Sequence, residues 1–159
     1  MFPTQNSLPE QIRGQSIDLL NKHLAAAIDL HAQLKQAHWN VRGPAFIAIH
    51  ELFDRISVEA EAMSDVIAER VGGLGGVAKG TLQVAAERSF LPPYLLGVGQ
   101  EEMHLGAIAA ALAAFGTSAR GAIGEATAFG DVDTADLFTE VSRTTDKQLW
   151  FIESHNVPA

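Results

Sequence analysis

The chain has 159 residues, a length typical of one domain that buries a substantial apolar core without metal or disulfide staples. It contains no cysteine, which excludes a disulfide scaffold, a thiolate zinc site and a cysteine nucleophile, so that any metal ion must be bound by nitrogen and oxygen. Acidic residues outnumber basic ones by 19 to 11, and this net charge of −8 disfavours unaided binding to nucleic acid and favours the attraction of cations.

Apolar residues recur every three or four positions, which indicates helices rather than strands. The first expected helix covers residues 9–38 and ends before Gly43 and Pro44, because proline biases the preceding residue away from helix. The second covers residues 45–70 and ends at Gly72 and Gly73, which are candidates for a left-handed cap.

The segment from 74 to 93 is less regular because glycines and a pair of prolines interrupt it. We expect a crossover connection that holds one short helix, over residues 81–87. A third long helix is predicted over 93–121. A fourth is predicted over 134–154, with Asp133 as its N-cap and Asp136 at its third position.

Four long helices with one long crossover predict an all-α fold, a ferritin-like four-helix bundle with a short helix between its second and third helices. We expect one domain over residues 1–159, with a short non-basic N-terminal extension over about 1–12. The N-terminus has no basic region followed by an apolar stretch, and the longest strongly apolar run, 105–115, is too short to span a bilayer of about 30 Å. We therefore expect a cytoplasmic protein that does not contact a membrane.

Five potential metal ligands stand out: His38 at the end of the first helix, and His50, Asp54, Asp65 and Glu69 on the second. Imidazole and carboxylate groups suit iron, manganese or zinc. At 100° per residue, the four residues of the second helix lie within about 100° of one another, on one face. Asp54 and Asp65 are nevertheless about 16 Å apart along the helix axis, too far to share a metal ion within one chain.

The four candidate ligands on the second helix, at positions 50, 54, 65 and 69, are symmetric about a point between residues 59 and 60. If two copies of the helix pair antiparallel across a two-fold axis at this point, His50 comes level with Glu69 of the partner subunit, and Asp54 with Asp65 of the partner subunit. The spacing thus predicts an isologous dimer with two identical sites, each completed by His38 and able to hold one or two metal ions. Taken alone, each i,i+4 pair is more often a solvated helix face than a metal site. Two pairs on a shared face with a common centre of symmetry favour the metal site.

The same residues belong to longer stretches with a recognisable pattern. Residues 36–43 (QAHWNVRG) are followed by Phe46, His50, Glu51, Phe53 and Asp54, and then by 65–70 (DVIAER). Near the end of the chain come 133–136 (DTAD), 142–143 (SR), 146–147 (DK) and 149–153 (LWFIE). Over nearly its whole length beyond about residue 15, the chain resembles the Dps family of ferritin-like proteins.

This resemblance implies a shell of twelve subunits that oxidises iron(II) at inter-subunit sites, with hydrogen peroxide preferred over dioxygen. The ferric mineral is kept inside, which protects against oxidative damage. By the same resemblance, the iron ligands and catalytic residues are His38, His50, Asp54, Asp65 and Glu69. Trp39 lies beside this site, where it either intercepts oxidising equivalents or simply packs.

Three acidic residues, Asp131, Asp136 and Glu140, resemble the family's three-fold pore, through which iron enters. Helix capping is the competing role for Asp131, Asp133 and Asp136. Many family members also compact DNA through lysine-rich tails, but residues 1–12 and 155–159 contain no lysine or arginine. DNA binding, with nucleoid association, is therefore the less favoured alternative, and a metal that only stabilises the dimer is a third.

Other signals carry less weight. Glu101 and His104 match a Glu-x-x-His element, but di-iron bundles need this element on two helices. We expect both residues at the surface, together with His23, His31 and His155. The glycines of 72–76 lack the Lys-Ser/Thr of a phosphate loop and predict a turn.

Overall fold

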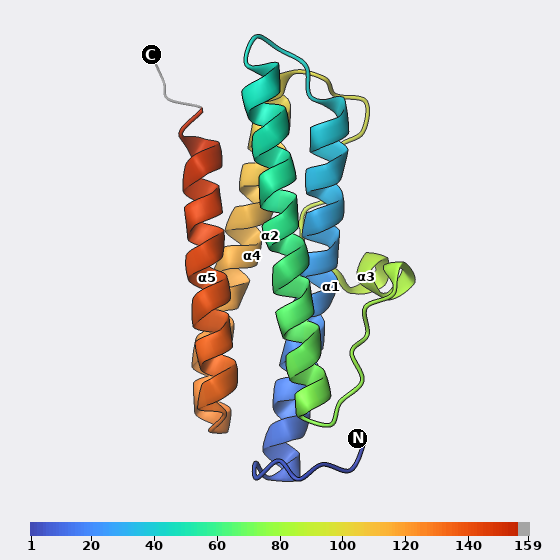
Figure 1. The fold of residues 1–159 in the computed structure, drawn as a ribbon, viewed down its shortest axis with the longest axis vertical. Coiled ribbons are helices and arrows are strands. Elements are labelled where there is room, and N and C mark those ends of the chain that lie inside the picture. The colour runs from blue at the N-terminus through green and yellow to red at the C-terminus, as the bar shows by residue number, and fades with distance from the viewer. Residues whose placement is uncertain (156–159) are drawn as a thin grey trace.

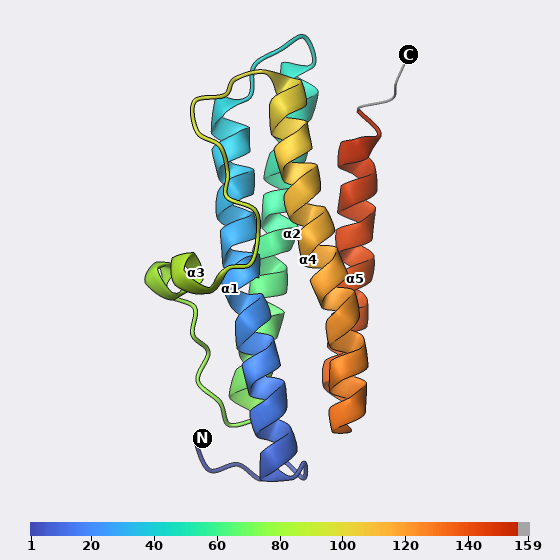
Figure 2. The same cartoon turned by 180° about the vertical axis from the view of Figure 1, so that it is seen from behind.

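The computed structural model describes residues 1–155; residues 156–159, part of the non-basic C-terminal end noted above, lie outside the described residues. The helices are α1 (Glu10–Asn40), α2 (Phe46–Gly73), α3 (Leu82–Arg88), α4 (Glu101–Phe129) and α5 (Val132–Glu153). Figure 1 and Figure 2 show four long helices side by side, with the short α3 beside α1 in the crossover. The all-α four-helix bundle with a short crossover helix is thus confirmed.

The bundle consists of two closely packed helix pairs. α1 lies along α2 and α4 along α5, while contacts between α1 and α4 join the pairs. Side chains of α2 also meet those at both ends of α5, from Arg55 against Phe151 to Arg70 against Asp131. The core between them includes the fully buried rings of Phe53, Phe115 and Phe138. Burial of each such ring contributes roughly 1.5–3 kcal/mol relative to exposure.

The position of α4 corrects the sequence prediction, since the helix covers Glu101–Phe129 instead of 93–121. Residues 92–100 stay outside the helix because two prolines are followed by Gly97, whose φ of 83° is left-handed. At the other end, Gly121 lies within the helix and did not end it. Its cost of about 1 kcal/mol relative to alanine is outweighed by the burial of the neighbouring Ala119 and Ala122.

Among the described residues, α4 alone is long and apolar enough to span a membrane by length and composition. The helix extends on both sides of the run 105–115 on which the sequence analysis based its expectation. The core helix of a soluble bundle passes the same test, and α4 buries Leu105, Ile108 and Phe115 in the core.

α2 ends at Gly73, within the expected glycine pair, but its left-handed residue is Gly75 rather than Gly72 or Gly73. The N–H of Gly76 donates to the carbonyl of Val71 at 2.8 Å, and the N–H of Gly75 to that of Gly72 at 2.9 Å. This is a Schellman motif. A Cβ at Gly75 would lie 2.7 Å from the carbonyl oxygen of Phe2, so the N-terminal segment also requires a glycine there.

The N-cap of α5 is Asp131, not Asp133. Its carboxylate accepts hydrogen bonds from the backbone N–H of Thr134 at 3.1 Å and from Arg70 at 2.8 Å, and it is 1% exposed. Burial by itself raises the pKa of Asp131, but the hydrogen bonds from Thr134 and the charge of Arg70 outweigh it and lower the pKa below 3.8. A carboxylate enclosed between α2 and α5 does not line an open pore, so the pore expectation for Asp131 is corrected as well.

Two histidines expected at the surface are buried. His23 is fully buried; its ring nitrogens bond to the carbonyl of Leu19 at 2.8 Å and the hydroxyl of Ser118 at 3.0 Å, which ties α1 to α4. His104 is 1% exposed, and its Nδ1 is hydrogen-bonded to the hydroxyl of Tyr94. Burial lowers the pKa of both histidines and raises the pKa of Tyr94 to about 12. Both are core residues that local periodicity did not distinguish from surface ones.

The other three residues expected at the surface differ in how far they are buried. His155 is exposed, as expected. His31 is partly buried, with its Nδ1 hydrogen-bonded to the carbonyl oxygen of Ser57. Glu101 is also partly buried, and its Oε2 accepts a hydrogen bond from the backbone N–H of Ala45 at 3.1 Å.

We expect Asp131→Ala to lower the free energy of unfolding by about 2–4 kcal/mol, because it removes the cap of α5 and the counter-charge of Arg70. Asp133→Ala, in the same turn but exposed, should cost less than about 1 kcal/mol. Because the folded pKa of Asp131 is lowered, its contribution is present above about pH 4 and is lost as pH falls through the folded pKa. Urea unfolding at one protein concentration measures both variants, and equal losses would contradict a cap at Asp131.

The burial of His23 should make the free energy of unfolding depend on pH. Since burial lowers its pKa, the unfolded chain binds a proton that the folded chain does not, between the folded pKa and about 6.5. The free energy of unfolding should therefore decrease as pH drops below about 6.5, by up to about 1.4 kcal/mol per pH unit. His23→Gln should make this dependence shallower, while the exposed His155→Gln should not. An unchanged slope in His23→Gln would refute the assignment.

Candidate metal site

His38 near the end of α1 and His50 near the start of α2 lie against each other at one end of the bundle. Their rings stack with centroids 3.7 Å apart. Nδ1 of each ring is 2.8 Å from the backbone carbonyl oxygen of the other residue. Because a carbonyl oxygen only accepts, each Nδ1 carries the proton and each Nε2 is left as an acceptor. This tautomer suits metal binding through Nε2, with the second nitrogen held by a backbone group.

The turn between α1 and α2 is held in place by the start of α4. The N–H of Arg42 donates to the carbonyl of Gly99 at 2.7 Å, and Glu101 accepts from Ala45. A Cβ at Gly43 would overlap the side chain of Glu101, so a glycine makes room for this contact. Glu101 thus supports the turn that presents His50. Sequence reasoning missed this role, because the contact joins residues far apart in the chain and has no local signal.

Asp54 lies one turn after His50 and is bound by a residue that the sequence analysis did not name. The Lys35 ammonium is 2.5 Å from its carboxylate, and this hydrogen bond holds the pKa of Asp54 below its usual value. Lys35 lies three residues before His38, so helical spacing could have placed it on the same face. Its Nζ is also 5.9 Å from the ring centroid of Trp39, which is 60% exposed.

Asp65 and Glu69 lie toward the other end of α2, exposed on the face that carries His50 and Asp54. Within residues 1–155 neither carboxylate has an ion-pair partner. No three His, Asp or Glu side chains of the described part of the chain come together to hold a metal ion. The predicted ligands thus fall into two groups on one chain, called half-sites below: His38, His50 and Asp54 form one, and Asp65 and Glu69 the other, and neither group by itself brings three ligands together.

The remaining pore candidates lie on α5. Asp136 and Glu140 are both exposed and one helical turn apart, in contrast to the enclosed Asp131.

Known proteins resemble this chain over nearly its whole length. Residues 17–157 match the family model of the ferritin-like domain. A DNA protection during starvation protein from Agrobacterium fabrum is 42% identical over 152 residues, which are 96% of this chain and 94% of that protein.

Solved structures agree with these sequence matches. DpsC from Streptomyces coelicolor has a TM-score of 0.93 at 35% identity, over 100% of this chain and 92% of that one. Dps from Microbacterium arborescens in its high iron form has a TM-score of 0.88 at 30% identity, over 96% and 98% of the two chains. These likenesses support, in general terms, a function in iron storage and ferroxidase-type chemistry. The chain belongs to the Dps proteins of the ferritin-like family.

Proposed function

We propose that this chain is a ferroxidase and iron-storage subunit that oxidises iron(II) between two subunits and keeps the ferric mineral inside a hollow shell of twelve. The observation that carries this proposal is the pair of half-sites on one face of α2, symmetric about a point between residues 59 and 60. In an antiparallel dimer, His38, His50 and Asp54 of one subunit meet the partner's Asp65 and the partner's Glu69. Membership of the Dps proteins is the second support.

Electrostatics favour a cation between the half-sites. Asp65 and Glu69 are like charges four residues apart on a helix, which repel each other by roughly 0.2–0.5 kcal/mol. A bound cation converts this repulsion into attraction. His38 and His50 contribute bare Nε2 atoms, and a mixed set of imidazole and carboxylate ligands suits iron.

Iron(II) is the substrate of the proposed reaction. Carboxylates are hard ligands that stabilise iron(III) more than iron(II), so binding favours oxidation. Two iron(II) ions held at one site give two electrons to one hydrogen peroxide, which is reduced to two hydroxide ions without release of hydroxyl radical. We propose peroxide as the preferred oxidant and dioxygen as the slower one. The residues of the chain fix the ligands and leave positions open for the oxidant.

Lys35 and Trp39 adjoin the site without being ligands. In the metal-free chain the Lys35 ammonium neutralises Asp54, so iron must displace it or share the carboxylate. Trp39 is exposed beside Lys35, where its ring is accessible to stray oxidising equivalents. Packing against a neighbouring subunit is the alternative role for Trp39.

Iron reaches the interior, in this proposal, through pores at which three subunits meet. Asp136 and Glu140 would line them and concentrate cations by electrostatic focusing. The setting we propose is the cytoplasm, without a membrane.

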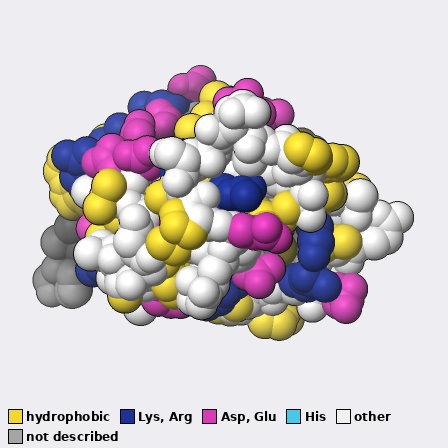
Figure 3. Space-filling view, turned by 90° about the horizontal axis from the view of Figure 1, so that it is seen from below, with side chains coloured by type: hydrophobic (Ala, Val, Ile, Leu, Met, Phe, Trp, Pro, Cys, Tyr) yellow, Lys and Arg dark blue, Asp and Glu magenta, His cyan; other side chains and the backbone are white. Residues whose placement is uncertain are grey.

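Non-specific DNA binding, with secondary iron activity, is the alternative function. The name of the Agrobacterium fabrum relative refers to DNA protection. On the end of the bundle drawn in Figure 3, however, Lys and Arg side chains lie in separate groups among acidic ones. Salt-sensitive retardation of DNA by the purified shell would favour this alternative. Intact sites that bind metal without oxidising iron would favour a purely structural metal.

Anaerobic loading with iron(II), followed by hydrogen peroxide, tests the ferroxidase. Wild type should oxidise iron rapidly, and His50→Ala/Asp65→Ala should slow the reaction at least about tenfold, because both half-sites lose a ligand. Ferric absorbance measures the rate, and a size measurement shows whether the shell is intact.

His155→Ala/Asp18→Ala is the matched control, since it removes one exposed histidine and one exposed aspartate away from the site. It should oxidise iron like wild type. Equally slow oxidation by wild type and by the site variant would contradict a ferroxidase at these residues.

Subunit mixing tests whether each site is shared. Asp54→Ala and Asp65→Ala homodimers should both be inactive, but a heterodimer of the two collects both losses in one site and leaves the other intact. Reassembly of an equal mixture should therefore restore about a quarter of wild-type activity. Asp54→Ala mixed with His50→Ala should restore nothing, because both residues lie in the same half-site. Inactivity of the first mixture would contradict the shared site.

A further inference from the structure

α1 carries a row of three polar residues, His31, Lys35 and His38, on the face that adjoins α2. His38 is bonded to His50, Lys35 to Asp54, and the Nδ1 of His31 to the carbonyl of Ser57 at 2.9 Å. Each member of the row is thereby fixed to a level along α2. Lys35 and His38 adjoin the proposed metal site, whereas His31 has no role in it.

α2 carries a matching acidic row that begins at Glu61, one turn before the proposed ligand Asp65. Glu61, Asp65 and Glu69 are spaced by four residues, so their side chains follow one another along one side of the helix. All three are exposed, and none has an ion-pair partner within residues 1–155. Glu61 thus extends the uncompensated acidic row beyond the metal ligands.

In the dimer of the proposed function, the row on α1 of one subunit faces the acidic row on α2 of the other. The inference drawn here rests on that dimer. The two-fold relation brings the level of His50 to that of the partner's Glu69, and the level of Asp54 to that of the partner's Asp65. It also brings the level of Ser57 to position 62 of the partner, next to the partner's Glu61. His31, which is bonded at the level of Ser57, therefore comes within one residue of the level of the partner's Glu61 along the helix axis.

We propose that His31 and the partner's Glu61 form a charge-assisted hydrogen bond that sets the register of the dimer. Nδ1 of His31 already donates to Ser57, so the ring donates to the carboxylate through Nε2 as an imidazolium. The other charged groups near this contact are Lys35 and Asp54, which are paired with each other, and the partner's Asp65. His31 and the partner's Glu61 would supply only two ligands to a metal ion, which are too few for a tight site. A direct hydrogen bond between them is therefore favoured over a bridging metal ion.

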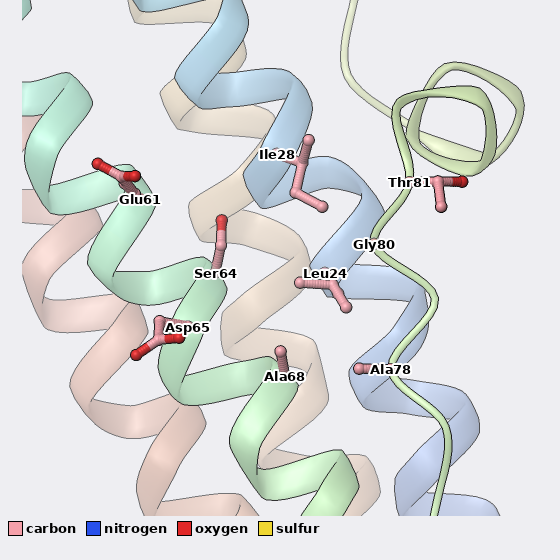
Figure 4. Close-up of a pocket in the computed structure, with 9 residues that line it drawn as sticks. All are labelled: Leu24, Ile28, Glu61, Ser64, Asp65, Ala68, Ala78, Gly80 and Thr81. Atoms are coloured by element: carbon pink, nitrogen blue, oxygen red, sulfur yellow. The ribbon is translucent and has the colours of Figure 1, made fainter.

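The surface around Glu61 is shaped to receive the partner. A groove of about 450 Å³ lies between α1, α2 and the crossover, and Figure 4 shows Glu61 and Asp65 on α2 at one side of it. Leu24 and Ile28 of α1 and Ala68 of α2 give it apolar walls. By the same two-fold relation, residues 31–38 of the partner's α1 pass over these levels, so the occupant is a second copy of this chain. Its cationic row is complementary in charge to the acidic rim.

Cross-linking of introduced cysteines tests this register directly, because the chain contains no cysteine of its own. Chains with His31→Cys and chains with Glu61→Cys are mixed, reassembled without metal and treated with a short bis-maleimide. A covalent dimer should form, since the linker spans the two side chains of a hydrogen-bonded histidine and glutamate, whose Cα atoms lie farther apart than the roughly 7 Å that a disulfide bridges. Glu61→Cys chains alone and Asp18→Cys mixed with Glu61→Cys are the controls, and both should give less covalent dimer on a denaturing gel.

A mixture of His50→Cys with Glu69→Cys separates the two proposals. If this pair links and the pair at 31 and 61 does not, the dimer of the proposed function stands and the contact of His31 is overturned. If neither pair links, the antiparallel dimer itself is wrong. Linking of both pairs supports both proposals.

A double-mutant cycle measures the contact without a covalent bond. In metal-free protein, His31→Gln and Glu61→Gln should each raise the dissociation constant of the dimer about two- to fivefold, and the double variant no more than the larger single effect. Asp18→Asn, an exposed acid outside both rows, should leave it unchanged. Additive effects of the two substitutions would overturn the contact.

Discussion

The stiffness of one long helix governs the geometry of the proposed iron site. α2 carries potential ligands near both of its ends, and a continuous helix does not fold back to bring them together. The half with two histidines and the half with two carboxylates therefore stay apart in every single chain. In the proposed dimer, association of two chains completes the site, and the symmetry of the spacing means that one dimer contains two complete sites.

The remaining structure holds the histidine half in shape. The rings of His38 and His50 bond to each other's backbone across the turn between α1 and α2, and Glu101 at the start of α4 holds that turn. The other end of the bundle is secured by different means, with the N-terminal segment against Gly75 and with Arg70 against Asp131. Rigid ends are what a site shared between subunits needs, because each subunit must present its ligands without adjustment.

Periodicity was enough to predict the four long helices and the short crossover helix, since these depend on local spacing. It failed where contacts between distant segments decide the outcome. Gly121 was predicted to end a helix, but α4 continues through it to Phe129 because the residues around it are packed in the core. His23 and His104 read as surface residues, yet Ser118 and Tyr94 give them partners inside the core. Asp133 is as good a cap as Asp131 by spacing, but in the structure the backbone N–H of Thr134 and the guanidinium of Arg70 both bind Asp131.

The reciprocal bonds of His38 and His50 also determine which nitrogen each ring can offer to a cation. Nδ1 of each ring is held on a backbone carbonyl, so Nε2 is the atom left open to a ligand role. The chain contains no thiol, so a soft cation that depends on sulfur finds no thiolate ligand here. The choice of cation is thereby limited to ions that accept imidazole nitrogen together with carboxylate oxygen.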